Sequence, residues 1–389
     1  MRIVVDENIP EASVFARHGE LTVLPGRHLT AADVQQADAL IVRSVTQVNA
    51  DLLRGSRVGF VGSCTIGTDH LDTAWLDAAG IVWSNAPGCN ARSVVEYVLA
   101  ALQLLATRHQ ARLEQRRFGI VGVGEVGQRL ACVLDALGWQ VMLCDPPREA
   151  TGAAPGVAAL PEQGFVSLDE VLEQCDVICL HTPLTSSGPW PTRHLLSAGQ
   201  LQKLRPGSWL LNAGRGPVVD NKALLQVLQQ RSDLSVVLDV WENEPWVDPQ
   251  LAARCALVTP HIAGYSLDGK IRGTEMIYQA FCRHFELEVK QGVQYPVPEI
   301  KALSISNSMP PEKLLQQLSS MFYQPLKDDA ALRATLSLDV QARAVAFDRL
   351  RKEYGVRREM LATRLCLPAG NQPLQQLAQA LGMQWQEET

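Results

Sequence analysis

Several features typical of nucleic-acid-binding, membrane or metal-binding proteins are missing from this sequence. Charged residues make up 20% of the 389 residues, the formal net charge is −6, and no run of basic residues occurs. This composition argues against a nucleic acid, a membrane surface or a polyphosphate as a partner. The nine cysteines show no C-x-x-C spacing, so we expect no metal site.

Long apolar runs are also absent. The longest apolar stretch, 94–106, contains Glu96 and Gln103 and is too short to span a bilayer. The opening residues MRIVVDENIP follow a strand pattern rather than that of a signal peptide. Cys144 and Cys179 lie in apolar segments, where they act as small hydrophobic residues, as is usual in a reducing cytosol. We therefore expect a cytoplasmic globular protein.

Short apolar segments alternate with helical patterns from the first residues onward, which predicts parallel sheets in α/β units. With 389 residues, 47% of them apolar, the chain is too long for one ordinary core. The expected strands of a first unit are 3–5, 21–24, 39–42, 58–62 and 81–83. A long amphipathic helix is expected at 91–109. The expected strands of a second unit are 118–121, 141–144, 177–180, 209–211, 236–239 and 257–259.

The patterns divide the chain into three expected domains. The helical pattern at 269–290 indicates a return to the first unit, and an Ala-, Gly- and Pro-rich surface loop is expected at 152–164. After Gly292, proline-punctuated segments and helical patterns at 311–322, 340–354 and 372–381 indicate a smaller domain. The expected boundaries are 1–93 with 265–290, then 94–264, then 291–389.

The segment GIVGVGEVGQRL, at 119–130, is the strongest motif. Gly122, Gly124 and Gly127 fit G-x-G-x-x-G between an expected strand and an expected helix. These glycines allow a tight turn, the approach of a pyrophosphate and close packing of helix on strand. Asp145 ends the next strand, where its carboxylate can bind a ribose hydroxyl and repel a 2′-phosphate. Together, the glycine motif and Asp145 predict a domain that binds NAD rather than NADP. The alternative interpretation is that the glycines form an ordinary turn with no ligand.

Three further segments place polar residues at or just beyond the ends of expected strands. Arg215 follows 209–211, Glu244 lies five residues beyond Asp239, and His261 follows 257–259. Arginine can hold a carboxylate through two hydrogen bonds, and histidine can take or return a proton. A glutamate bonded to the histidine would orient its ring. Together they predict oxidation of a 2-hydroxy acid, with hydride passing to a nicotinamide and the hydroxyl proton to His261. Taken singly, Arg215 is also compatible with a surface cation, His261 with a loop cap and Glu244 with a turn carboxylate.

Residues 1–290 resemble the D-isomer-specific 2-hydroxyacid dehydrogenases. The matching segments are GTDHLD, N-x-x-x-V-V-E, GVGEVG, NAGRG, DVWENEP and HIAG. The resemblance implies two Rossmann-like doubly wound parallel-sheet domains facing across a cleft, one binding substrate and one binding NAD. The smaller C-terminal domain, mainly helical α+β, would complete the chain. The family's catalytic residues fall on Arg215, Glu244 and His261. Its NAD contacts fall on Gly124, Glu125, Val126, Asp145, Thr182, Ala213, Gly214, Arg215, Asp239 and Gly264.

Other segments resemble one branch of this family, which acts on a phosphorylated 2-hydroxy acid. They are VDENIP, VRSVTQVN, APGCNARSVVEYV, CDPPR and HIAGYSLDGKIRGT, together with the helical extension after residue 290. This resemblance implies substrate contacts at Ser44, Thr65 and Tyr265 and a homodimer built through the C-terminal domain. Four nearby cations could hold the phosphate group of the substrate: Arg43, Arg92, Lys270 and Arg272. The alternatives are another phosphorylated hydroxyacid dehydrogenase, such as a 3-phosphoglycerate dehydrogenase, and a non-enzymatic NAD-sensing corepressor.

Overall fold

A computed structural model describes residues 1–152, 164–290 and 292–388. Its internal contacts divide the chain into a first unit, Met1–Ala91 with Tyr265–Val297, and a second unit, Arg92–Gly264 with Pro298–Thr389. Most of the loop expected at 152–164 lies outside the described residues. In the described part of the chain, no helix is long and apolar enough to cross a membrane.

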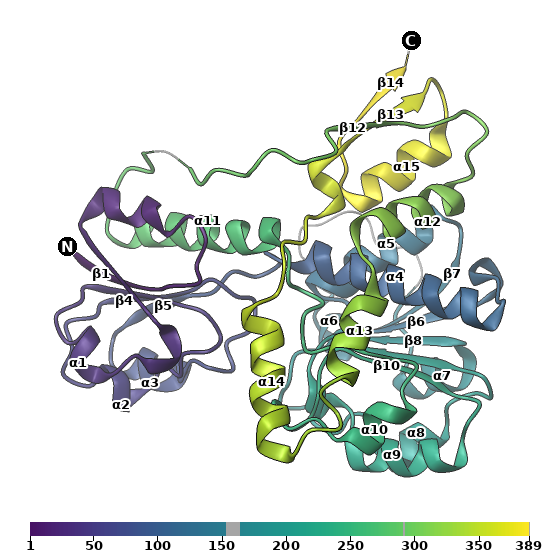
Figure 1. The fold of residues 1–389 in the computed structure, drawn as a ribbon, viewed down its shortest axis with the longest axis horizontal. Helices are drawn as coiled ribbons and strands as arrows, with labels where there is room; N and C mark the ends of the chain where they lie inside the picture. Colours follow the sequence, from purple (N-terminus) through teal and green to yellow (C-terminus); the bar gives the residue numbers. More distant parts are fainter. Residues whose placement is uncertain (153–163, 291, 389) are drawn as a thin grey trace. The chain divides into compact units, whose positions relative to one another are not determined.

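The first unit contains a five-stranded parallel sheet in the order β2-β1-β3-β4-β5. Figure 1 draws the N-terminal part of this unit in purple. All five predicted strands are confirmed, with shifts of one or two residues at some ends. The sequence order of the strands reverses between β1 and β3, which is where open α/β sheets bind ligands. The strands are β1 (Arg2–Asp6), β2 (Glu20–Leu24), β3 (Ala39–Val42), β4 (Phe60–Ser63) and β5 (Val82–Ser84).

Helix α11 (Leu267–His284) returns to the first unit and packs against β4 and β5, as its pattern predicted. Its buried aromatic residues Tyr278 and Phe281 meet Phe15 edge-on, at ring distances of 5.5 and 5.4 Å. The core of this unit is therefore built from both ends of its discontinuous sequence. Its other helices are η1 (Ala12–His18), η2 (Gly26–His28), α1 (Ala31–Val34), α2 (Ala50–Leu53) and α3 (Thr73–Ala78).

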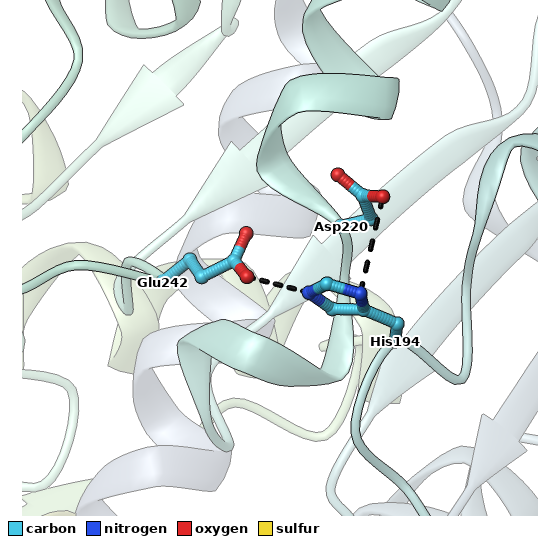
Figure 2. Close-up of side chains that lie close together, drawn as sticks. All are labelled: His194, Asp220 and Glu242. Atoms are coloured by element: carbon cyan, nitrogen blue, oxygen red, sulfur yellow. Dashed lines mark hydrogen bonds and ion pairs between the residues drawn. The ribbon is translucent and has the colours of Figure 1, made fainter.

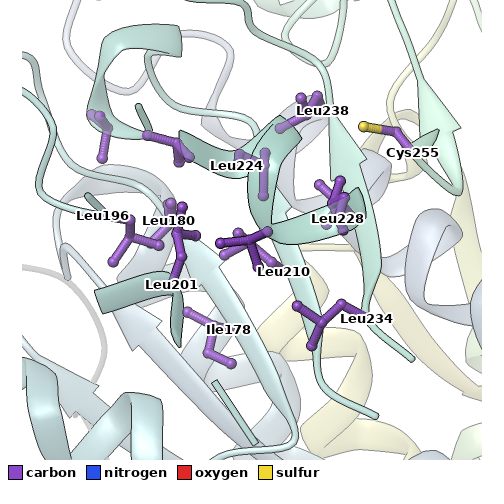
Figure 3. Packing of buried hydrophobic residues seen from close by; sticks show 14 of the residues in the cluster. Ile178, Leu180, Leu196, Leu201, Leu210, Leu224, Leu228, Leu234, Leu238 and Cys255 are labelled. Carbon is purple, nitrogen blue, oxygen red and sulfur yellow. The ribbon is translucent and has the colours of Figure 1, made fainter. Parts of the chain in front are cut away.

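The second unit contains a six-stranded parallel sheet in the order β11-β10-β9-β8-β6-β7. The six predicted strands are confirmed, and the strand order reverses between β6 and β8. Figure 3 shows the leucine-rich core on one side of this sheet. The strands are β6 (Arg117–Val121), β7 (Gln140–Cys144), β8 (Val177–Leu180), β9 (Trp209–Asn212), β10 (Ser235–Leu238) and β11 (Leu257–Val258).

Helices connect these strands. The predicted helix at 91–109 is α4 (Ala91–His109), and α5 follows the glycine-rich turn. The others are η3 (Leu113–Gln115), α5 (Glu125–Ala136), α6 (Pro146–Thr151), α7 (Leu168–Gln174), α8 (Ala198–Gln202), η4 (Gly216–Val218), α9 (Asn221–Gln230) and α10 (Pro249–Arg254).

The C-terminal region carries a three-stranded parallel sheet, β12-β13-β14, among several helices. It packs into the second unit: Leu332 and Phe347 belong to the same buried hydrophobic cluster as the leucines of the six-stranded sheet, and α15 packs on α5. Its elements are β12 (Ala302–Ser304), α12 (Pro311–Phe322), α13 (Pro325–Arg333), α14 (Val340–Lys352), η5 (Met360–Ala362), β13 (Arg364–Pro368), α15 (Gln372–Leu381) and β14 (Trp385–Glu388).

Candidate active site

The turn between β6 and α5 has the geometry of a dinucleotide-binding turn. Gly122 has a φ of +87°, and a Cβ there would lie 2.7 Å from the backbone nitrogen of Thr182. A Cβ on Gly127 would lie 2.0 Å from the carbonyl oxygen of Gly122, so only glycine lets the helix approach the strand this closely. At Gly124, the N-cap of α5, a Cβ would meet no atom within 4 Å. The helix N-terminus therefore faces open space that a phosphate can enter.

Asp145 joins the end of β7 to this turn. Its Oδ2 accepts a hydrogen bond from the backbone nitrogen of Val123 at 2.7 Å, and its Oδ1 accepts one from the backbone nitrogen of Arg148 at 3.1 Å. Arg148 ends the segment CDPPR but was not among the expected cofactor contacts. Its guanidinium donates to the carbonyl oxygen of Val123, while its Nε and Nη2 are buried with no hydrogen-bond partner among the described residues. Orphaned donors of this kind are satisfied by a bound ligand or by water.

The loop after β8 lies beside the same turn. Burial lowers the pKa of the His181 ring to about 4, so this ring is neutral at pH 7. The hydroxyl of the next residue, Thr182, is buried without a hydrogen-bond partner in the described part of the chain. A Cβ on Gly214 would lie 3.3 Å from the carbonyl oxygen of Thr182, so the loop after β9 lies against this segment. These groups surround the point where the strand order reverses.

Arg215 lies in a loop that packs tightly on the loop after β10. A Cβ on Gly216 would lie 1.9 Å from the carbonyl oxygen of Trp241. Asn212, the last residue of β9, donates its side-chain Nδ2 to the carbonyl oxygen of Arg215 at 3.0 Å. The backbone that carries Arg215 is therefore held against the segment that carries Glu244.

His261 and Glu244 form a direct pair. His261 Nδ1 lies 2.7 Å from Glu244 Oε2, and Glu244 Oε1 accepts a hydrogen bond from the backbone nitrogen of Trp241 at 2.9 Å. Burial raises the pKa of Glu244. However, the charge of His261, its hydrogen bond, the charge of Arg351 and the Trp241 nitrogen outweigh burial, so the pKa lies below its ordinary value. Glu244 is thus an ionised partner that fixes the ring and leaves Nε2 for a proton.

The buried carboxylate of Asp239 shapes the loop that carries His261. Asp239 Oδ1 accepts hydrogen bonds from the hydroxyl of Thr259 at 2.6 Å and the backbone nitrogen of Ile262 at 2.8 Å. Its Oδ2 accepts one from the backbone nitrogen of Ala263 at 3.0 Å. His261 has a φ of +56°, which is uncommon for a residue other than glycine, and these bonds on both sides hold it there. The family resemblance implied an NAD contact for Asp239, and the structure adds this positioning role.

His194 links the loop around Arg215 to the loop around Glu244. The sequence patterns did not indicate this role of His194. Figure 2 shows its ring between two carboxylates: Nε2 lies 2.5 Å from Glu242 Oε1, and Nδ1 lies 3.9 Å from Asp220 Oδ2. Three donor atoms of this cluster lie within 4.8 Å of one another, close enough to ligate a metal ion. The bond from Nε2 to Glu242 already satisfies that nitrogen, and it ties the loop after β10 to His194.

The remaining predicted cofactor contacts lie in the same unit. Glu125 and Val126 form the first turn of α5, Ala213 precedes Gly214, and Gly264 ends the loop that follows His261. The glycine turn, the space before α5 and the orphaned Thr182 hydroxyl fit a dinucleotide. When bound there, the cofactor supplies a hydride acceptor. The individual cofactor contacts stay predictions.

The predicted substrate contacts Ser44, Thr65 and Tyr265 lie in the first unit. Ser44 is an exposed residue just after β3. The hydroxyl of Thr65 lies 2.9 Å from that of Ser63 at the end of β4. The ring of Tyr265 lies just before α11 with Lys270 Nζ 4.7 Å from its centroid. All three are at the carboxyl edge of the sheet or the start of α11.

Known proteins match both the sequence and the fold. Residues 92–263 match the family described as D-isomer specific 2-hydroxyacid dehydrogenase, NAD binding domain, and residues 295–382 match a domain of unknown function. The solved D-lactate dehydrogenase from Aquifex aeolicus, complexed with NAD and lactic acid, is similar with a TM-score of 0.61 and 23% identity over 73% of this chain and 95% of its own. The solved NAD-bound 3-phosphoglycerate dehydrogenase from Entamoeba histolytica is similar with a TM-score of 0.62 and 23% identity, over 76% of this chain and 99% of its own. These likenesses show the fold.

The chain belongs to the D-isomer specific 2-hydroxyacid dehydrogenases, and residues 92–263 are its NAD-binding domain. Among its curated relatives, the erythronate-4-phosphate dehydrogenase of Ectopseudomonas mendocina is 53% identical over 385 residues, 98% of this chain and 99% of that protein. The enzyme of the same name from Pseudomonas aeruginosa is 50% identical over 387 residues, 99% of this chain and 100% of that protein. The expected family, fold class and cofactor are therefore confirmed.

Proposed function

We propose that this chain is an erythronate-4-phosphate dehydrogenase. It oxidises carbon 2 of 4-phospho-D-erythronate to give 2-oxo-3-hydroxy-4-phosphobutanoate, with NAD as the hydride acceptor, in the biosynthesis of pyridoxal 5′-phosphate. The observation that carries this proposal is the Glu244–His261 pair, 2.7 Å apart, in a chain whose full-length relatives bear that name. Such a pair suits removal of a proton from a hydroxyl group.

Each catalytic residue has a distinct task. Glu244 accepts the hydrogen bond from Nδ1 of His261, which fixes the ring and leaves Nε2 to take the proton of the substrate's 2-hydroxyl group. Glu244 also stabilises the imidazolium formed in that step. Arg215 holds the substrate carboxylate through paired hydrogen bonds. The product is a 2-oxo acid, with the hydroxyl proton on His261 and the hydride from carbon 2 on the nicotinamide.

The three expected domains remain part of the proposal. Residues 1–93 with 265–290 would bind the substrate, 94–264 would bind NAD, and 291–389 would form a dimer interface. Contacts group the C-terminal region with the second unit, and Leu314, Leu315 and Leu318 are buried within the chain. These three leucines are therefore not available to a partner. Exposed apolar residues elsewhere in that region support a homodimer: Val340, Val345 and Val356.

The nine cysteines are all free, which supports a cytoplasmic location for this protein.

The test is turnover of a panel of phosphorylated 2-hydroxy acids, followed by absorbance at 340 nm. We expect 4-phospho-D-erythronate to give the highest kcat/KM, and His261→Ala to lower kcat by about a hundredfold or more. A preference for 3-phosphoglycerate would favour the alternative dehydrogenase. Binding of NAD without turnover of any acid would favour a corepressor.

A further inference from the structure

Two segments of the first unit leave adjacent strands at the same edge of the sheet. β3 and β4 are parallel neighbours, with Val42 opposite Ser63. Arg43 and Ser44 follow β3, and Thr65 lies two residues beyond β4. β3 is also one of the two strands between which the strand order reverses. This edge is therefore the ligand-binding position of an open α/β sheet.

Helix α11 brings a second cation to this edge. A Cβ on Gly273 would lie 2.6 Å from the carbonyl oxygen of Cys64, so the first turns of the helix rest on the end of β4. Lys270 lies three residues before Gly273, on the same face of the helix. Its Nζ lies 4.7 Å from the centroid of the Tyr265 ring.

Arg43 and Lys270 lie close enough for their charges to interact. In the part of the chain that the structure describes, neither side chain has a hydrogen bond or an ion pair with a carboxylate, and both are only partly exposed. Burial and, to a smaller extent, the charge of Arg43 together lower the pKa of Lys270 to about 8. Two like charges held together in partial burial are unfavourable unless an anion compensates them.

The other two candidate cations already have backbone partners. Arg272 donates to the carbonyl oxygen of Cys89. Arg92 belongs to the second unit and donates to the carbonyl oxygen of Ala380. Of the four cations that the sequence left open, the structure therefore favours Arg43 and Lys270.

We propose that Arg43 and Lys270 form the subsite for the phosphate group of the substrate. The inference rests on the proposed function, in which Arg215 takes the carboxylate, so the phosphate is the remaining anionic group. Two cations match the two negative charges of a phosphate monoester. The arginine fork can bond two phosphate oxygens at once, and the lysine acts as a compact charge. The hydroxyls of Ser44 and Tyr265 lie on the same segments and can bond the remaining oxygens.

Arg43→Gln and Lys270→Gln test this subsite in the full-length protein. Each change should raise KM for 4-phospho-D-erythronate by about ten- to a hundredfold, the scale for losing a hydrogen bond to a charged group, and leave kcat within about threefold. The kcat/KM for unphosphorylated D-erythronate should stay nearly unchanged. Arg54→Gln, which removes an exposed cation of the same unit, is the matched control and should change neither value.

Binding of inorganic phosphate, measured by calorimetry, separates this proposal from the proposed function. Wild-type protein should bind phosphate, and both glutamine variants should bind it at least about tenfold more weakly. Lys270→Arg should keep most of the affinity, which shows that a loss in Lys270→Gln is not caused by misfolding. The subsite is wrong if wild-type protein does not bind phosphate, or if both substrates lose kcat/KM equally in the glutamine variants. A protein that binds phosphate through these residues but oxidises no phosphorylated acid would overturn the proposed function alone.

Discussion

The guanidinium of Arg357 donates a hydrogen bond to the carbonyl oxygen of Ala263 at 3.1 Å. Its other terminal nitrogen donates to the carbonyl oxygen of Ser93 at 2.7 Å and lies 3.8 Å from a carboxylate oxygen of Glu96. The side chain is almost fully buried, and Ala263 is two residues beyond His261. A residue of the C-terminal region thus supports the loop that carries the proposed catalytic base.

Arg357→Met should destabilise the protein by about 3–5 kcal/mol, because it leaves Glu96 buried without its cation. Chemical denaturation of the variant would measure this loss. Arg364→Met, which removes an exposed arginine of β13, should stay within about 0.5 kcal/mol of wild type. Equal stability of the two variants would show that the contact with Glu96 and Ala263 contributes little.

Glu244→Gln should move the acidic limb of the kcat/KM profile for hydroxyacid oxidation to lower pH, by about one unit or more. The substitution removes the negative charge that lies 2.7 Å from Nδ1 of His261 and stabilises the imidazolium formed in the reaction. Rates measured between pH 5 and 9 would check this shift. An unchanged limb would contradict the pairing.

The same substitution should change stability in a pH-dependent way. The pKa of Glu244 is lowered in the folded protein, so its contribution is fully present above the unfolded-state value, about 4.3, and is lost as pH falls through the folded value. The stability difference between wild type and Glu244→Gln should therefore shrink as pH falls below about 4. Denaturation at several pH values would measure it.

Asp145→Asn should narrow the difference in kcat/KM between NAD and NADP. The amide oxygen can still accept the hydrogen bond from Val123, so the glycine turn keeps its support while the charge that repels a 2′-phosphate is removed. Asp145→Ala should narrow the preference too but also lower stability, because it loses that bond. Comparable use of both cofactors by wild-type protein would show that Asp145 does not select NAD.

Removal of the residues after Gly292 should give an unfolded or aggregated protein rather than a stable monomer. Leu332 and Phe347 are fully buried in the core of the second unit, and Asp329 Oδ1 accepts a hydrogen bond from the backbone nitrogen of Val258 at 2.8 Å. Light scattering would report a dimer for the full-length chain. A full-length monomer, or a truncated chain that remains a well-behaved dimer, would contradict the proposed interface.

The pH dependence of substrate binding should reflect Lys270. Because the pKa of Lys270 is lowered from 10.5 to about 8, the free protein loses this charge as pH rises through 8. KM for the phosphorylated substrate should therefore rise above that pH. In Lys270→Arg the rise should disappear, because arginine stays charged. A rise that is identical in wild type and Lys270→Arg would assign it to another group.

The sequence predicted the sheets well because their strands are short apolar segments with local signals. It also indicated the glycine turn, Arg215, Glu244 and His261, which follow strands or lie in recognisable segments. The expected α+β C-terminal domain is confirmed, but the sequence did not place its strands, of which β14 is exposed throughout.

The sequence also gave no sign of the contacts that support the site. Asp329 and Val258 are 71 residues apart in the chain, and Arg357 and Ser93 are 264 residues apart. His194 shows no periodicity or motif of its own, and Arg148 lies in the segment CDPPR without a pattern that indicates its contacts. Such residues acquire their roles only when the fold brings distant segments together.

Burial of the cysteines makes this chain suitable for labelling at one position. Eight of the nine thiols are buried and only Cys132 is partly exposed. Burial raises the pKa of the Cys132 thiol too, and it raises the pKa of the Cys144, Cys179 and Cys255 thiols to about 12, so few thiolates form in these three at pH 7. A maleimide fluorophore should therefore modify the native protein at Cys132, on α5, the helix that follows the nucleotide turn. A dye at that position would report cofactor binding by fluorescence without any engineered cysteine.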